Sequence, residues 1–244
     1  MQQDKKKEIK FFDNFVEKHD QYIGLSNESF ERLYLELSKS LSSFNDNIKI
    51  IDLGCGTGTF TKKLLNLSDD VFGCDISEKS IIKARKLNSK IKFINEDIEN
   101  LSLTNETFDI VILSGVLHHF ENSNKVLLES KRILKKGGLL FAFDPNLHNP
   151  FFWLYRRKKS FFYSLKGVTE NEEPLTKKHI FKSMKLAEFN QINVYGISNM
   201  PFKYIDSKIL RVFLPIYNLF DSFININPYV RNAFGSFLIT KGYK

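Results

Sequence analysis

Apolar residues recur along this chain in two periods, which predict strands and helices in turn. Short runs rich in Ile, Val, Leu and Phe predict buried strands at 48–53, 71–76, 91–94, 108–115 and 139–143. Apolar positions three or four residues apart predict helices after residue 58, at 78–87 and at 124–135, the last ended by the sequence K-K-G-G. Strands that alternate with helices in this way are typical of a parallel sheet covered on both faces.

The same patterns extend the prediction to both ends of the chain. Residues 5–44 carry helical spacing broken near Gly24, so we expect two helices before the first strand. After residue 175, a helix at 176–187 and strands near 191–198 and 235–242 complete the pattern. We therefore expect seven strands.

Three glycines follow the first strand in the sequence D-L-G-C-G-T-G, from Asp52 to Gly58. Glycine lets the main chain turn sharply and approach a ligand closely, and the free N–H groups that open the next helix face that ligand. A dinucleotide fingerprint needs G-x-G-x-x-G, and here the third glycine comes one residue early, with Thr59 in its place. This departure weakens the prediction of a nicotinamide cofactor but leaves it open.

The motif D-x-G-x-G-x-G after a strand resembles motif I of the class I S-adenosylmethionine-dependent methyltransferases. The sequence R-I-L-K-K-G-G-L-L-F resembles a second motif of that family, with Lys136 where proline is usual. The nearest likeness is to the small-molecule methyltransferases of ubiquinone and menaquinone biosynthesis. The resemblance implies an α/β, Rossmann-like sheet of seven mostly parallel strands, the last antiparallel, with helices on both faces. It also implies one domain over 1–244, divided as follows: a helical cap at 1–44, a cofactor-binding core at 45–145, and insertions on the active-site face at 146–174 and 200–232.

The resemblance also assigns cofactor-binding roles to the ends of four strands. Asp75 at the tip of the second strand would accept the ribose hydroxyls, and Ile76 would lie on the adenine. Past the third strand, Asp97 would accept from the adenine amino group, with Glu96 as the alternative, and Ile98 lies beside them. The backbone around Gly54 and Ser114 would hold the methionine part of S-adenosylmethionine, and Gly56 and Gly58 of the same turn would also bind the cofactor. Asp52 would either order the glycine loop or bind the amino group.

Two adjacent histidines follow the fourth strand in the sequence S-G-V-L-H-H-F. Open α/β sheets place their active sites at the carboxyl ends of strands, so an imidazole here suits a general base for a hydroxyl acceptor near neutral pH. The family resemblance makes His119 the first choice and His118 the second. Because neighbouring side chains usually point apart, we expect no metal site.

Charge and cysteine content narrow the class of protein. Residues 1–144 hold 21 basic and 22 acidic side chains, whereas residues 145–244 hold 15 and 6, so the whole net charge of +8 comes from the second part. This asymmetry suggests an anionic partner. Two cysteines outside any C-x-x-C pattern, no signal-peptide pattern and no apolar run of 18 residues predict a cytoplasmic protein without a membrane span.

The two insertions hold 14 of the 34 aromatic residues, mixed with the basic run from Arg156 to Lys159. We expect them to cover the site as a lid, or to touch the inner face of a membrane through 151–163 and through a largely apolar helix predicted at 207–224. The sequence thus predicts a methyltransferase for a small-molecule or lipid-linked, anionic acceptor, with oxygen as the methylated atom. A non-catalytic S-adenosylmethionine-binding or RNA-binding protein is the alternative, although nucleic acid is the less favoured partner because no N-P-P-Y-like turn follows the fourth strand. The oligomeric state stays open.

Overall fold

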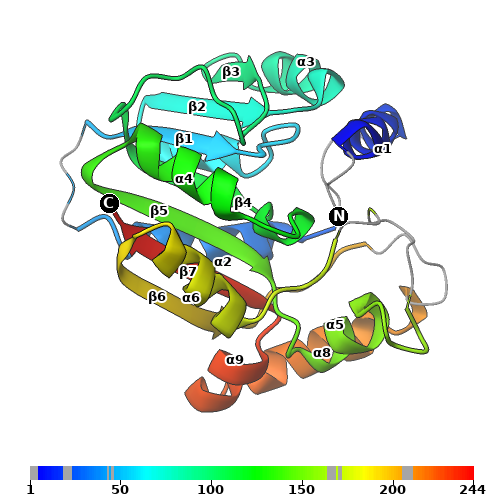
Figure 1. Cartoon of the computed structure of the whole chain (residues 1–244). Coiled ribbons are helices and arrows are strands. Elements are labelled where there is room, and N and C mark those ends of the chain that lie inside the picture. Colours follow the sequence, from blue (N-terminus) through cyan, green and yellow to red (C-terminus); the bar gives the residue numbers. More distant parts are fainter. Residues whose placement is uncertain are drawn as a thin grey trace.

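The computed structural model describes residues 5–18, 24–42, 44, 47–163, 169, 172–204 and 211–244 (Figure 1). A sheet of seven strands runs through them in the order β3-β2-β1-β4-β5-β7-β6. In chain order the strands are β1 (Lys49–Leu53), β2 (Asp70–Asp75), β3 (Lys92–Asn95), β4 (Phe108–Ser114), β5 (Leu134–Pro145), β6 (Asn190–Ile197) and β7 (Phe237–Tyr243).

The first five strands are parallel, and β7 is antiparallel to both of its neighbours, β5 and β6. Because β6 is antiparallel to β7, it points the same way as β1. The expected mostly parallel, seven-stranded sheet with an antiparallel last strand is confirmed. The carboxyl ends of six strands therefore meet at one edge, which lies on the right in Figure 1.

Alternate residues of the central strands feed two separate apolar cores. Ile50 and Ile110 point to the face covered by α2, η1 and α3, whereas Ile51 and Val111 point to the face covered by α4 and α6. All four side chains are completely buried. A strand covered on both faces needs apolar residues at consecutive positions, which explains the unbroken apolar run of β4.

The helices on and around the sheet are α1 (Lys5–Lys18), α2 (Asn27–Ser38), η1 (Thr61–Asn66), α3 (Glu78–Leu87), η2 (Leu117–His119), α4 (Asn124–Ile133), α5 (Pro150–Arg156), α6 (Lys177–Leu186), α8 (Leu214–Ile224) and α9 (Pro228–Phe234). Ser26, Ser77 and Thr176 cap α2, α3 and α6 by accepting from backbone N–H groups with their side chains.

Three predicted helices differ in the structure. The segment after the glycine turn is a 3₁₀ helix, η1, and not an α-helix. Helix α4 ends at Ile133, and the K-K-G-G sequence that we took for its end forms the start of β5, where the pairing with β4 is irregular. The described helix within 207–224 begins at Leu214, and residues 207–210 lie outside the described residues.

Helices from distant parts of the sequence gather at the carboxyl edge of the sheet (Figure 1). Helix α1 packs against α3 at the β2 and β3 end of the edge. From the β5 and β6 end come α5 and α8, which contact each other through Phe151, whose ring centroid lies 5.1 Å from that of Tyr217. Both insertions thus contribute to one aromatic layer beside this edge.

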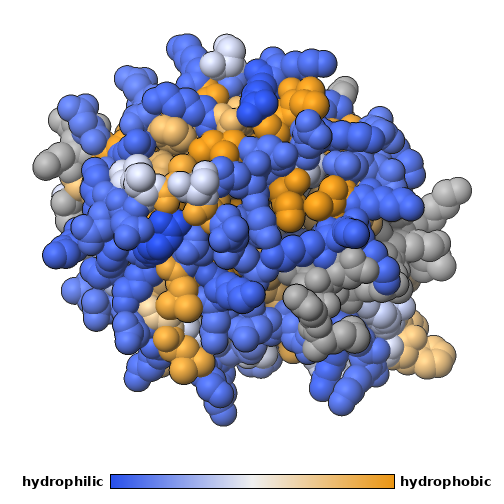
Figure 2. All heavy atoms as spheres, turned by 45° about the horizontal axis from the view of Figure 1, so that its top comes forward, coloured by the Kyte–Doolittle hydropathy of each residue, from blue (hydrophilic) through white to orange (hydrophobic). Residues whose placement is uncertain are grey.

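Figure 2 shows the molecule turned so that the top of Figure 1 comes forward. The surface seen there is mostly polar, and its apolar side chains form small separate groups. Among the described residues, no helix is long and apolar enough to cross a membrane.

Candidate active site

The glycine turn after β1 has a backbone that only glycine adopts without strain at several positions. Gly54, Gly56 and Gly58 have φ of +74°, +53° and +78°. A Cβ at Gly54 would lie 2.2 Å from a methyl of Val116, whereas a Cβ at Gly56 would meet nothing within 4 Å. Gly54 therefore lets two loops pack closely, and Gly56 leaves a space that a ligand can fill.

Asp75, at the tip of β2, lies directly against this turn. Its Oδ2 accepts from the backbone N–H of Gly56 at 2.8 Å, and its Oδ1 accepts from that of Ser77 at 2.9 Å. Burial raises the pKa of Asp75. The carboxylate keeps lone pairs for further donors, so its place fits the ribose-binding role that the family resemblance implies. Ile76 follows at the same strand end, half-buried.

Asp52 is completely buried beneath the turn. Its two oxygens accept from the hydroxyls of Thr61, at 2.7 Å, and Ser114. Burial raises the pKa of Asp52 to about 7, although both hydroxyls oppose this shift. Of the two roles that the sequence left open for Asp52, the geometry supports the ordering of the loop, because the carboxylate joins β1, η1 and β4.

Past β3, the two adjacent acids have different partners. Glu96 accepts from the backbone N–H of Ser102, at 2.9 Å, and from its hydroxyl, which ties Glu96 to its own loop. Asp97 pairs with Lys5 of α1. The candidate adenine contact Asp97 therefore faces the helix that covers the edge, and Ile98 is buried behind it.

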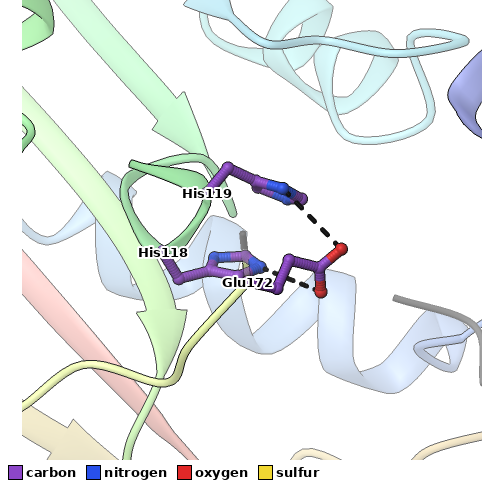
Figure 3. A group of neighbouring side chains, drawn as sticks. All are labelled: His118, His119 and Glu172. Atoms are coloured by element: carbon purple, nitrogen blue, oxygen red, sulfur yellow. Dashed lines mark ion pairs between the residues drawn. The ribbon is translucent and has the colours of Figure 1, made fainter. Parts of the chain in front are cut away.

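His118 and His119 lie side by side, which contradicts our expectation that neighbouring imidazoles would point apart (Figure 3). They end the 3₁₀ turn η2 just past β4, and their ring centroids are 4.3 Å apart with an interplanar angle of 38°. Neighbouring side chains point apart in most backbone conformations, but the tight 3₁₀ turn here brings these two together. The reason for expecting no metal site was therefore wrong.

Three acids surround the imidazole pair. Asp144, at the end of β5, accepts from His118 through Nδ1, at 2.9 Å, and through its backbone N–H, at 3.1 Å. Glu172 reaches both rings, with Oε2 3.9 Å from His118 Nε2 and Oε1 3.7 Å from His119 Nδ1. Glu8 of α1 lies 3.5 Å from the same Nδ1 of His119.

This environment shifts the pKa values of the two rings in opposite directions. Burial lowers the pKa of His118 to about 3, and the neighbouring His119 adds to this effect. Burial also acts to lower the pKa of His119, but Glu172 and Glu8 outweigh it and raise that pKa. Burial raises the pKa of Asp144 to about 8. His118 is therefore a neutral imidazole with a fixed orientation, and His119 carries the proton more readily.

The sequence prediction missed the acids of this cluster. The sequence could have indicated Asp144, since it ends a strand (β5) that is the parallel neighbour of β4, and both strands end at the same edge. Glu8 lies one helical turn from Phe12, which packs its ring against His119 at 5.5 Å, but such a helix face resembles any amphipathic helix. Glu172 had no signal, because its place depends on a backbone bond from Glu173 N–H to the His118 carbonyl, across a long insertion.

Comparison with known proteins identifies this arrangement. Residues 51–142, from β1 through most of β5, match the family described as "Methyltransferase domain". Residues 51–142 thus have the sequence pattern of a methyltransferase domain. The match bears out the resemblance to class I S-adenosylmethionine-dependent methyltransferases, for which S-adenosylmethionine is the expected cofactor.

Curated relatives of the methyltransferase domain include two enzymes of known acceptor. A malonyl-[acyl-carrier protein] O-methyltransferase of Buchnera aphidicola is 31% identical over 137 residues, which cover 56% of this chain and 53% of that protein. A ubiquinone biosynthesis O-methyltransferase of Bartonella tribocorum is 32% identical over 119 residues, which cover 46% and 48%. The chain thus spans about half the length of the curated relatives that it matches.

Among solved structures, the fold continues over nearly the whole chain. A Thermotoga maritima S-adenosylmethionine-dependent methyltransferase, described as a possible histamine N-methyltransferase, superposes with a TM-score of 0.62. The match covers 96% of this chain and 99% of that one at 19% sequence identity, so it shows the fold alone. The match to the family model covers residues 51–142, whereas the likeness in fold extends over nearly the whole chain.

Proposed function

We propose that this chain transfers a methyl group from S-adenosylmethionine to a hydroxyl oxygen of an acceptor bound beside His118 and His119. One observation carries the proposal: the glycine turn closes on Asp75 at the same sheet edge where the imidazole pair lies. The sulfonium supplies an already activated methyl carbon, so the protein mainly has to align the acceptor with it.

Different side chains bind the cofactor and remove the proton from the acceptor. Asp75 holds the cofactor at its ribose, and Gly56 leaves the main chain open beside it. The acceptor hydroxyl gives up its proton at the imidazole pair, where His119 was the first candidate for the base. His118 is the second candidate: Asp144 fixes its Nδ1 side and leaves Nε2 facing the cluster, but burial lowers its pKa to about 3, which makes it the weaker base.

Cofactor binding tests the core of this proposal. Calorimetric titration with S-adenosylmethionine, S-adenosylhomocysteine and NADH would compare the wild type with Asp75→Asn and with Asp70→Asn. Asp70 is the matched control, because it begins the same strand and pairs with Lys92 at the surface. We expect both sulfur ligands to bind and Asp75→Asn alone to weaken them at least tenfold; binding of NADH alone would overturn the proposal.

Turnover separates an enzyme from the alternative of a non-catalytic or RNA-binding module. Methyl transfer from labelled S-adenosylmethionine would be screened over phenolic and lipid-linked hydroxyl compounds. We expect His118→Ala or His119→Ala to abolish most turnover while cofactor affinity stays within about twofold. A protein that binds single-stranded RNA and transfers no methyl group to any acceptor would favour the alternative.

The class of acceptor follows from the aromatic layer of α5 and α8. Phe152 lies against Tyr217, Phe202 and Phe237, with ring centroids 6.0 to 6.4 Å apart. This layer stands at the carboxyl ends of β5 and β6, on the side of the imidazole pair away from α3. An apolar or lipid-linked acceptor with an anionic part fits such a neighbourhood and the basic second half of the chain.

Helix α8 is apolar on its exposed face as well as on most of its buried face. Its buried Asp221 accepts from the backbone N–H of Met200 and the hydroxyl of Ser236, both at 2.6 Å. Its outer face carries Leu219 and Phe223, which are 74% and 70% exposed. Apolar side chains in such numbers on an outer helix face mark a surface that contacts something apolar.

Other exposed apolar side chains lie within and near α8, together with basic ones. They comprise Trp153, Phe161, Phe162, Val212, Phe213, Ile216, Ile226 and Tyr229. The basic run 156–159 follows α5 at the same end of the molecule, and the Arg157 guanidinium lies over the Trp153 ring. Aromatic rings flanked by arginine and lysine suit the boundary of an anionic bilayer. We therefore assign this face to peripheral contact with an anionic membrane, where a lipid-linked acceptor would be presented.

Vesicle flotation tests the membrane contact. The wild type should float with vesicles containing phosphatidylglycerol and remain in solution with pure phosphatidylcholine. Leu219→Ser with Phe223→Ser should reduce binding at least tenfold, whereas Leu128→Ser, which removes an exposed leucine of α4, should not. Equal binding by the wild type and the double variant would exclude this face, and so would a dimer that the double variant converts to a monomer in sedimentation velocity.

A further inference from the structure

The cluster of His118, His119 and Glu172 has the composition and spacing of a transition-metal site (Figure 3). One ligand atom from each residue lies within 4.8 Å of the other two. Around a tetrahedral ion with bonds of about 2.0–2.2 Å, ligand atoms lie about 3.3–3.5 Å apart. The two imidazole–carboxylate distances are 3.9 and 3.7 Å, one to each oxygen of Glu172, so a rotation of this carboxylate is needed to place one oxygen at that distance from both nitrogens.

The second observation concerns the orientation of His118. Its Nδ1 is bonded to the buried carboxylate of Asp144, which leaves Nε2 as the ligand atom and turns it toward Glu172. Metal-binding histidines are typically oriented by a carboxylate in this way. No such arrangement is needed to pack an imidazole, and a carboxylate buried as deeply as Asp144 costs stability unless it serves a partner.

The third observation is a buried ring nitrogen that lacks a hydrogen bond. Within the described part of the chain, Nδ1 of His119 has no hydrogen-bond partner, although it faces Glu172 and Glu8. Buried polar atoms usually have hydrogen-bond partners, and an ion placed between this nitrogen and the two carboxylates would supply one. The carboxylates of Glu172 and Glu8 beside the imidazoles also favour a divalent cation electrostatically.

We propose that His118 Nε2, His119 Nδ1 and Glu172 bind a divalent transition-metal ion of the Zn²⁺ type. Two nitrogens and one oxygen form the set of three protein ligands that is typical of sites with an open position. Asp144 orients His118 from behind, and Glu8 covers the site from α1. The open position faces the place of the acceptor, so oxygen atoms of a hydroxyl or carboxylate can complete the coordination.

The proposed metal site adds to the proposed function and rests on it only for the position of the acceptor. With the ion bound, the two imidazoles would act on the acceptor oxygen through the metal and not as free bases. Ion binding itself needs neither S-adenosylmethionine nor acceptor. Failure of cofactor binding would therefore leave this inference standing, and failure of ion binding would leave the methyltransferase proposal standing.

Metal titration of the full chain tests the site directly. Protein purified without a histidine tag and stripped with a chelator would be titrated with Zn²⁺ by calorimetry and with Co²⁺ by visible spectroscopy. We expect one ion per chain and the visible absorption of a four- or five-coordinate cobalt ion. His118→Ala, His119→Ala and Glu172→Gln should each weaken binding at least tenfold, whereas His148→Ala, at an exposed histidine, should not.

The variant Asp144→Asn distinguishes weaker ion binding from a loss of folding. The variant should bind the ion 10- to 100-fold more weakly, with an altered cobalt spectrum, while thermal unfolding without metal stays cooperative. Absence of stoichiometric binding in the wild type would overturn the proposal. Binding that survives in the His118→Ala/His119→Ala double variant would do the same, because the ion would then lie elsewhere.

Discussion

Nδ1 of His118 lies 2.9 Å from Oδ1 of Asp144, a carboxylate with no exposed surface. The backbone N–H of the same histidine donates to the same oxygen, so the turn and the ring are held together. Because this oxygen already accepts from the backbone N–H, we expect it to accept from the ring as well, with the proton on Nδ1 and with Nε2 left for an acceptor proton or a metal ion.

The tautomer of His118 can be measured. Long-range ¹⁵N–¹H NMR of the wild type at neutral pH should show a neutral His118 ring protonated at Nδ1, and Asp144→Leu should shift its population toward the Nε2-protonated form. The exposed His148 supplies the reference signals of an imidazole in water. An Nε2-protonated His118 in the wild type would contradict the hydrogen bond to Asp144.

The glycines of the turn should respond differently to substitution. Gly54→Ala would drive a methyl group into Val116, and we expect this variant to lose several kcal/mol of stability or to fail to fold. Gly56→Ala carries only the backbone strain of a positive φ, about 1–2 kcal/mol, but its methyl group fills the ligand space. Thermal melts and calorimetry should therefore show Gly56→Ala folded but at least tenfold weaker in binding S-adenosylmethionine. Unchanged affinity would place the cofactor elsewhere.

Asp52 should make stability depend on pH. Its pKa is about 7 in the folded chain, against 3.8 as the ordinary value, so its contribution to stability is largest below pH 4 and is lost as the pH rises toward 7. Asp52→Asn removes this dependence while keeping groups that can bond Thr61 and Ser114. Between pH 5 and pH 8, the stability of Asp52→Asn relative to wild type should rise by up to about 3 kcal/mol. Urea denaturation at both pH values measures it, and Asp70→Asn, at the exposed pair with Lys92, should show no comparable change.

Asp221 should be important for anchoring α8. Asp221→Ala would leave the Met200 N–H and the Ser236 hydroxyl without their acceptor, and we expect a loss of about 2–4 kcal/mol. Chemical denaturation measures the loss, with Ser222→Ala on the exposed side of the same helix as control. A destabilisation below about 0.5 kcal/mol would mean that α8 is held by its aromatic contacts alone.

The sheet could be predicted because its signals are local. The unbroken apolar run of β4 reports burial on both faces, and the glycines after Asp52 report a turn that other residues cannot make. The place of Asp75 at the strand tip follows from the same local pattern. The 3₁₀ form of η1 could not be predicted, because apolar residues three or four apart fit both kinds of helix.

The acids around the histidines could not be predicted, because they are brought together by tertiary contacts. Glu8 reaches His119 from a helix more than one hundred residues away in the chain, and Glu172 from an insertion whose path depends on packing. The exposed apolar face of α8 was also hidden: the sequence showed a narrow polar stripe, and the structure shows that Asp221 of this stripe packs inward. Periodicity reports that a helix has two faces and leaves open which one packs.

Helix α1 reaches the places of both ligands with one short stretch of chain. Lys5 pairs with Asp97, Asp13 accepts from the Ser77 hydroxyl at 2.7 Å beside Asp75, and Glu8 approaches His119. We therefore expect α1 to move when either the proposed cofactor or the proposed acceptor is exchanged. Initial-rate kinetics should accordingly follow a sequential order, with release of S-adenosylhomocysteine tied to the opening of α1 and therefore slowed by solvent viscosity.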